Sequence, residues 1–260
     1  MSQQHKVISY NIRYGSANDG NNSWEFRRSV FYNHVNQLDL DIMGIQEGLH
    51  WQLQEMKYGL NSKYDYVGVG RDDGNKLGEY CAIWYHTEKY TILQHGTFWL
   101  RENSETPGPA FDSNVNRICT WAQLQDKNTK DKLIVHNAHF DWESASSQRK
   151  SVDLIIKFVK KWKSENGKII VLGDFNADQN SHVAEKMRDA GFIDSFYKLY
   201  PNDKNSTFHD FTGKAYGGKI DFIWIFDKDF SVVEASIDQY REHFKFPSDH
   251  FAVWALLASK

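Results

Sequence analysis

The sequence is poor in cysteine, and this scarcity narrows both the fold and the chemistry. Only two cysteines, Cys81 and Cys119, occur in 260 residues, and both fall inside apolar segments without CxxC spacing. This pattern argues against a disulfide framework or a cysteine zinc site, so we expect both to be small buried side chains. The chain also contains no low-complexity segment, no coiled-coil pattern and no recognisable domain linker.

Long apolar runs and an excess of positive charge are also absent. No stretch is long enough to span a membrane, and the polar start of the chain contains no apolar leader, so we expect a soluble cytoplasmic protein without a membrane partner. The net charge is −3. This balance argues against the global basic field of proteins that grip long duplex nucleic acid, so stable binding of duplex DNA is not expected.

Aromatic and aliphatic residues, in contrast, are abundant. Hydrophobic residues make up 40% and aromatic residues 15% of the chain, with nine tryptophans. Not all of these large side chains can be exposed, so they must line a core or a cleft. At 260 residues the chain is long for one ordinary domain but within the range of single α/β or two-sheet folds.

The stretch Lys168 to Asp178, KIIVLGDFNAD, is the segment around which the chain is organised. Its short apolar run of mostly β-branched residues predicts a strand buried on both faces, which Gly173 ends. Asp174 and Asn176 follow at i and i+2, and in extended backbone this spacing places both side chains on one side. Taken alone, the segment is equally well interpreted as a strand that runs into an Asx-type turn.

Apolar periodicity and capping residues predict the other elements. Helices are expected over residues 23–38, with Ser23 as N-cap, and over 50–60, 144–163 and 182–190. Strand-like segments are expected over residues 6–13, 41–47, 64–70, 79–85, 90–100, 118–125, 132–139, 217–226, 229–237 and 247–258.

The order strand, helix, strand occurs twice in the predicted elements. Asn11 and Glu47 are separated by nearly the same length of chain as His139 and Asp174, and each pair stands at the strand ends of one such unit. Each unit alone offers a sheet with an uncovered face, and packing the two sheets together buries both faces. The sequence therefore predicts a single α/β domain over residues 1–260, built of two pseudo-equivalent halves.

Polar side chains collect at the predicted strand ends. Any single one has a structural explanation, but together they form an oxygen-rich set with histidine and arginine and without paired cysteine. Such a set suits a hard cation such as Mg²⁺ or Mn²⁺ and a phosphate better than zinc. The set consists of Asn11, Glu47, Glu79, Arg117, His139, Asp174, Asn176, Asp221, Asp249 and His250.

Asp221 lies within an otherwise apolar predicted strand, where a buried carboxylate needs a partner. His250, at the start of the last strand, is the natural candidate. An Asp–His pair fixes the tautomer of the imidazole and favours its protonated form. No GxSxG-like elbow provides a serine nucleophile.

The ordered motifs resemble the endonuclease/exonuclease/phosphatase superfamily over nearly the whole chain. The motifs are NIR with Asn11, QE with Glu47, EY with Glu79, NR with Arg117, NAHFD with His139, GDFNAD with Asp174 and Asn176, KIDFI with Asp221 and SDH with Asp249 and His250. The resemblance implies a four-layered α/β sandwich, like that of deoxyribonuclease I. It is greatest to the deadenylases related to the carbon catabolite repressor protein, the Angel-like branch.

The resemblance also implies a role for each residue. Glu47 corresponds to the principal Mg²⁺ ligand, with Asp249 and Asn11 close by. Asp174 orients or deprotonates the attacking water, Asn176 helps to position it, and His250, held by Asp221, stabilises negative charge. His139, paired with Glu79, and Arg117 contact phosphate oxygens, as Asn11 does and as Arg13 could. Trp142 and Phe175 are either stacking surfaces for a base or packing aromatics.

The departures from the family pattern narrow the range of expected substrates. Lys219-Ile220-Asp221 replaces the Cys-Asp-Arg run of inositol phosphatases, and His139 replaces the tyrosine of exonuclease III relatives. We expect Mg²⁺-dependent, in-line hydrolysis of a phosphodiester or phosphomonoester in short single-stranded RNA or nucleotides. The alternative is a phosphatase of a sugar or inositol phosphate. A non-catalytic binding protein of the same fold would be expected to have lost some catalytic or metal-ligating residues, whereas every expected polar position is filled. The oligomeric state is left open.

Overall fold

The computed structural model describes residues 3–162 and 167–260. The strands are β1 (Gln4–Asn11), β2 (Ile42–Leu49), β3 (Tyr64–Val67), β4 (Glu79–His86), β5 (Tyr90–Trp99), β6 (Ile118–Asp126), β7 (Lys132–His139), β8 (Lys168–Asp174), β9 (Phe192–Asp194), β10 (Asp221–Phe226), β11 (Phe230–Asp238) and β12 (Ala252–Ser259). The helices are α1 (Trp24–Leu38), α2 (His50–Gly59), α3 (Ala145–Trp162), α4 (His182–Asp189), α5 (Ser195–Leu199) and the 3-10 turn η1 (Gly20–Asn22).

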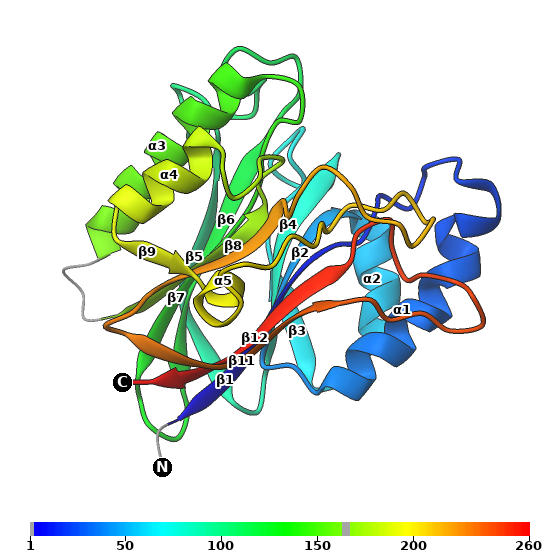
Figure 1. Cartoon of the computed structure of the whole chain (residues 1–260), viewed down its shortest axis with the longest axis horizontal. Coiled ribbons are helices and arrows are strands. Elements are labelled where there is room, and N and C mark those ends of the chain that lie inside the picture. Colours follow the sequence, from blue (N-terminus) through cyan, green and yellow to red (C-terminus); the bar gives the residue numbers. More distant parts are fainter. Residues whose placement is uncertain (1–2, 163–166) are drawn as a thin grey trace.

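Two six-stranded sheets pack face to face, with α1 and α2 on the outer face of the sheet that contains β1, and α3 and α4 on the outer face of the sheet that contains β8 (Figure 1). The first sheet has the order β11-β12-β1-β2-β4-β3, and the second has the order β5-β6-β7-β8-β10-β9. In each sheet the two central strands, β1 with β2 and β7 with β8, are parallel, while the flanking strands are antiparallel. The four-layered α/β sandwich expected from the sequence is therefore confirmed.

Three hydrophobic clusters fill the three interfaces between these layers. Strand β8 shows the principle, because its side chains alternate between two of them. Ile170 and Leu172 pack between the sheets, whereas Ile169 and Val171 pack under α3 and α4. A strand covered on both faces must be apolar at every position, which explains the continuous apolar run of its sequence.

Buried amides join the two sheets beneath their strand ends. Asn137 of β7 donates from Nδ2 to the carbonyl oxygens of Ile45 (3.0 Å) and Ala82 (2.8 Å) in the first sheet. Its Oδ1 accepts from Gln46 Nε2 at 2.6 Å. A fully buried amide must find such partners, so this group fixes how the two sheets lie on each other. The division into two pseudo-equivalent halves stays a prediction.

Several local expectations need correction. Strand β3 ends at Val67, three residues before Gly70, and the segment 192–199 forms β9 and α5, which are too short to show a period. Ser23 stands at the N-cap of α1, but its side chain makes no capping hydrogen bond among the described residues. The last residue of the predicted third helix, Lys163, lies outside the described residues.

Two expectations that followed from absent sequence features can be compared with the structure. Cys81 and Cys119 are free and buried, as expected. Within residues 3–162 and 167–260, no helix is long and apolar enough to cross a membrane.

Gly173 generates a stability prediction. Its φ is +150°, and a Cβ atom there would lie 2.0 Å from the Ala138 carbonyl oxygen of the neighbouring strand. Gly173→Ala therefore combines backbone strain with a backbone clash, and we expect it to lower the free energy of unfolding by about 2–5 kcal/mol. Urea denaturation measures the loss.

Gly217→Ala is the matched control for this prediction. Its φ is +79°, but no described atom lies within 4 Å of the added Cβ. We expect it to cost only about 1–2 kcal/mol, from backbone strain alone. Equal losses in the two variants would contradict the proposed clash with β7.

Candidate active site

The carboxyl ends of the parallel pairs in both sheets open into one cleft. The cleft has a volume of about 480 Å³. Its lining residues are Arg13, Tyr14, Glu47, Arg71, Glu79, Val115, Arg117, His139, Trp142, Asp174, Asn176, Phe208, Ile220, Asp249 and His250. Of the predicted site residues, only Asn11 and Asp221 are missing from this wall, and both contact residues that form it.

A β-bulge turns the side chain of Glu47 into the cleft. Gln46 pairs with Cys81 and Gly48 with Tyr80, so Glu47 is the extra residue in β2. Its φ is +65°, which is uncommon for a residue with a side chain. Bulges of this kind redirect one side chain out of the regular alternation of a strand. The two carboxylate oxygens accept hydrogen bonds from Asn11 Nδ2 (2.9 Å) and the Tyr14 amide (3.1 Å).

Asn11 links the two sheets at the cleft. The same Nδ2 that donates to Glu47 also donates to Asp174 Oδ2 at 3.0 Å. Its Oδ1 accepts from the Arg13 amide at 3.0 Å, and this bond fixes the orientation of the amide. Glu47 comes from the first sheet and Asp174 from the second, so one buried donor positions both carboxylates.

His250 forms the expected pair with Asp221. The His250 Nδ1 to Asp221 Oδ2 distance is 3.0 Å, and both residues are buried. Burial by itself lowers the pKa of His250, but the charge and hydrogen bond of Asp221 raise that pKa to about 10. The imidazole is therefore protonated at neutral pH, and its Nε2 faces Asp174 Oδ2 at 3.9 Å.

Asp174 is suited to accept a proton. Burial and the nearby charge of Asp221 raise its pKa to about 7, although His250 and the hydrogen bonds from Asn11 and the Asn176 amide oppose the rise. A pKa near the working pH is what a general base requires.

Asn176 fixes the tautomer of His139. Asn176 Nδ2 donates to the Phe140 carbonyl oxygen at 3.0 Å, so the amide nitrogen must be the atom on that side. It also lies 3.1 Å from His139 Nε2, which must then accept, so the ring proton resides on Nδ1. Burial and the charges of Arg117 and Arg71 hold the pKa of His139 well below its usual range. His139 is therefore neutral, with Nδ1 facing Glu79 Oε2 at 3.9 Å, the expected pair.

Two arginines form one wall of the cleft. Arg71 Nη1 donates to Glu79 Oε2 at 2.6 Å, and the Arg71 carbonyl oxygen accepts from Trp99 Nε1 at 2.6 Å. Arg117 is 5% exposed, and its Nε and Nη1 have no hydrogen-bond partner among the described residues. Sequence reasoning found Arg117 but missed Arg71, because its loop of glycines and aspartates gave no strand-end signal.

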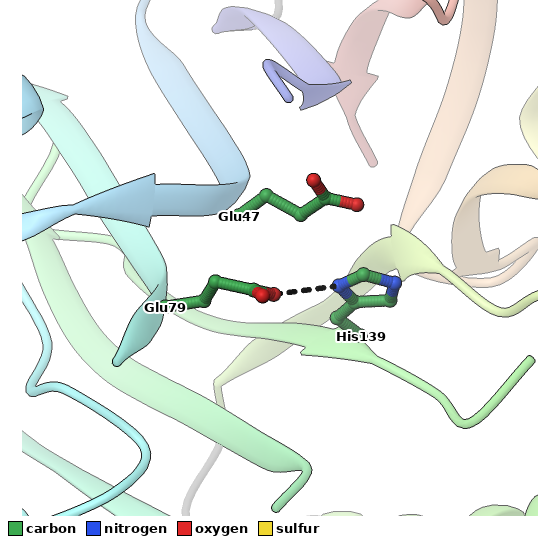
Figure 2. Close-up of side chains that lie close together, drawn as sticks. All are labelled: Glu47, Glu79 and His139. Carbon is green, nitrogen blue, oxygen red and sulfur yellow. Dashed lines mark ion pairs between the residues drawn. The ribbon is translucent and has the colours of Figure 1, made fainter. Parts of the chain in front are cut away.

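The donors at the cleft fit a divalent cation. Glu47 and Glu79 each offer a carboxylate oxygen, and these oxygens and a ring nitrogen of His139 lie within 4.8 Å of one another (Figure 2). Because His139 Nδ1 carries a proton and Nε2 accepts from Asn176, the two carboxylates are the ligands that this group offers. Burial and the charge of Glu47 also raise the pKa of Asp249, which a nearby cation would reverse. An oxygen-rich set with buried, mutually repelling carboxylates suits a hard metal ion. The resemblance assigns Glu79 and His139 to phosphate binding, yet both lie beside Glu47, the expected metal ligand.

Three remaining residues differ in what they offer the cleft. Phe175 is fully buried against Phe140 and Phe222, so of its two interpretations the packing aromatic applies. Trp142 is 64% exposed and lines the cleft. Arg13 also lines it, although its guanidinium pairs with Asp19 at 3.0 Å.

A larger cavity, of about 840 Å³, is lined by residues of α4, β9 and α5 and by neighbouring loops. It contains none of the predicted site residues, whereas the smaller cleft gathers eight of them. Convergent titratable groups locate the chemistry better than volume does.

A four-layered sandwich with an acid- and histidine-lined cleft defines a class of hydrolases that cleave phosphate esters. Residues 8–250 match the model of the endonuclease/exonuclease/phosphatase family. The chain belongs to this family and is one of its phosphoesterases. The family generally uses a divalent metal ion, which agrees with the donors in the cleft.

Individual relatives cover the chain to different extents. A mannosyl-6-phosphatase of Bacteroides thetaiotaomicron is 33% identical, with a TM-score of 0.91 over 98% of this chain and 99% of that one. Another family member from the same organism is 32% identical, with a TM-score of 0.92 over 100% and 96%. Ccr4, the 3′-5′-exoribonuclease subunit of the CCR4-Not complex of Phaeosphaeria nodorum, is 24% identical over 96% of this chain, which spans 58% of Ccr4.

The Asp221–His250 pair generates a titration prediction for the metal-free protein. The imidazole should stay protonated up to about pH 10. In Asp221→Asn the charge that raises its pKa is gone while burial remains, so protonation should be lost at lower pH. NMR titration of labelled histidine measures the change.

Asp238→Asn is the control, since it removes the carboxylate of another Asp–His pair, 3.0 Å from His34 Nε2. That variant should leave the titration of His250 unchanged. An unchanged His250 titration in Asp221→Asn would contradict the role of the pair.

Proposed function

We propose that the chain is a Mg²⁺-dependent phosphomonoesterase that removes phosphate from a small phosphorylated sugar. The arginine wall of the cleft carries this proposal. Arg71 donates to Glu79, and Arg117 keeps two buried nitrogens without a partner in the described residues. A terminal phosphate carries nearly two negative charges near pH 7, and a diester phosphate carries one. The unpartnered guanidinium donors therefore favour the more highly charged phosphate monoester.

The residues around the phosphate divide the work of hydrolysis. Asp174 accepts a proton from the attacking water, whose oxygen forms the new bond to phosphorus as the bond to the sugar oxygen breaks. The Asn176 amide and Asn11 Nδ2 hold that carboxylate in place. His250 stabilises the negative charge that grows on the phosphate, because Asp221 keeps its imidazole protonated. The departing sugar oxygen takes up a proton from solvent and Asp174 returns its proton there, so the products are the sugar and inorganic phosphate.

Glu47, Asp249 and Asn11 would hold the metal ion, with Glu79 and His139 beside Glu47. A divalent cation bound there neutralises charge on the phosphate and on the departing oxygen.

The comparisons support a sugar phosphate over an RNA end. The similarity to the mannosyl-6-phosphatase extends over 99% of that protein, whereas the chain spans 58% of Ccr4. An exoribonuclease acting on short single strands is the second candidate, because Trp142 is 64% exposed at the cleft and could stack on a base. A cytoplasmic location stays a prediction.

Metal removal tests the cation site. We expect EDTA to abolish turnover and added Mg²⁺ to restore it. Glu47→Gln should require a higher Mg²⁺ concentration for half-maximal activity, because a neutral ligand replaces an anionic one. Activity measured across a Mg²⁺ titration provides the comparison. Full activity of Glu47→Gln at low Mg²⁺ would refute the ligand role.

A substrate panel tests the choice of ester. With Mg²⁺ present, kcat/KM should be highest for a sugar phosphate such as mannose 6-phosphate, with release of inorganic phosphate. Arg71→Ala should raise KM for this substrate about tenfold to a hundredfold, since it removes the proposed hydrogen bond between the guanidinium and the phosphate of the substrate. Arg71→Lys keeps the positive charge but loses the paired N–H donors of the guanidinium, so it should raise KM by less.

One outcome of the substrate panel would contradict the phosphatase proposal. If a short single-stranded RNA has the highest kcat/KM and is shortened without release of inorganic phosphate, the exoribonuclease replaces the phosphatase.

A further inference from the structure

A third cavity, smaller than the two described above, is lined by a residue that follows a lining residue of the catalytic cleft in the chain. It has a volume of about 380 Å³ and is called the side cavity below. Its lining residues are Gly15, Ser23, Trp24, Glu25, Arg28, Trp51 and Glu55. Tyr14 lines the catalytic cleft and the next residue, Gly15, lines the side cavity. Tyr14 and Gly15 are consecutive, so the same loop borders both spaces.

Trp51 supplies an aromatic surface in the side cavity. The residue is 43% exposed although its side chain is large and apolar. A Cβ atom on Gly15 would lie 2.6 Å from Trp51 Cη2, so a glycine is needed where the loop packs on the ring. The Gly15 amide donates to Gln52 Oε1 at 2.8 Å, which ties the loop to α2 beside Trp51. The position of the indole is therefore fixed before any ligand arrives.

Polar groups surround this indole. Glu55 Oε2 accepts from Trp24 Nε1 at 2.9 Å and from Arg28 Nη1 at 3.1 Å, so its carboxylate is held in one orientation. Within the described part of the chain, the Glu25 carboxylate makes no hydrogen bond or ion pair, and Ser23 makes no side-chain capping bond. An aromatic surface bordered by fixed carboxylate, guanidinium and hydroxyl groups is suited to a ring that carries several hydroxyls.

The charge of the side cavity selects against another phosphate. Two carboxylates, Glu25 and Glu55, face a single guanidinium, Arg28, which leaves a formal charge of −1. Each further unit of a nucleic acid strand would bring a phosphate into this negative space. A neutral sugar unit has no such cost and offers hydroxyls to the carboxylates.

We propose that the side cavity binds a neutral saccharide unit of the substrate, while the phosphate at the end of the same molecule lies in the catalytic cleft. The substrate is then a phosphorylated oligosaccharide rather than a lone sugar phosphate. This inference rests on the proposed phosphatase function and extends it to the part of the substrate that does not react.

Trp51→Ala tests the proposal with two substrates, mannose 6-phosphate and a mannose disaccharide with a phosphate on carbon 6 of one unit. KM for the disaccharide should rise about tenfold, as for the loss of an aromatic anchor, while KM for mannose 6-phosphate stays unchanged. Trp51→Phe should retain most of the affinity. A rise in KM for both substrates, or for neither, overturns the proposal.

Tyr58→Ala is the matched control, because Tyr58 is an exposed aromatic residue of the same helix, α2, that does not line the side cavity. It should change neither KM. Circular dichroism of Trp51→Ala checks that the variant is folded.

A binding experiment separates failure of this inference from failure of the phosphatase proposal. Saturation-transfer NMR with unphosphorylated mannotriose should detect binding to the wild-type protein and to Tyr58→Ala, but not to Trp51→Ala. This result supports the saccharide site even if no sugar phosphate is hydrolysed. Absence of binding to the wild-type protein overturns the saccharide site, whatever the substrate panel shows about phosphatase activity.

Discussion

The amide of Asn11 is the contact on which the geometry of the cleft depends. Its nitrogen donates to Glu47 from the first sheet and to Asp174 from the second. Two carboxylates near each other repel, and a shared neutral donor lets both stay close without adding charge. The position of this amide depends in turn on how the sheets pack, which the buried contacts of Asn137 with Ile45 and Ala82 fix from below.

Much of the fold could be predicted from the sequence because the layers are regular. Strands covered on both faces, such as β8, must be continuously apolar, and α3 carries an apolar stripe at helical spacing. The segment 192–199 could not be predicted, since three strand residues and five helix residues are too few to show a period. Its place is set by pairing with β10, a tertiary contact that leaves no local signal.

The candidate site could be predicted only in part, because some of its residues lie at strand ends and others lie in loops. The ordered motifs identified strand-end residues such as Glu47 and His250, because topology brings the carboxyl ends of the parallel strands and the start of β12 to one edge. Arg71 was missed because it belongs to a loop and is aimed at the cleft by contacts of its own carbonyl oxygen with Trp99 and Asn116. Phe175, interpreted from the sequence as either a stacking or a packing aromatic, is the latter, since alternation beyond β8 turns it into the core.

Strained backbone recurs where the cleft is built. Glu47 and Asn176 have φ values of +65° and +47°, and Gly173 has +150°. Such conformations persist only where their surroundings hold them. Here β2 is paired on both sides, by β1 and β4, and β8 is paired by β7 and β10, so the central strands of the two sheets supply that support. A site at the centre of each sheet can therefore tolerate distortions that an edge strand could not, which explains why the polar ends gather there.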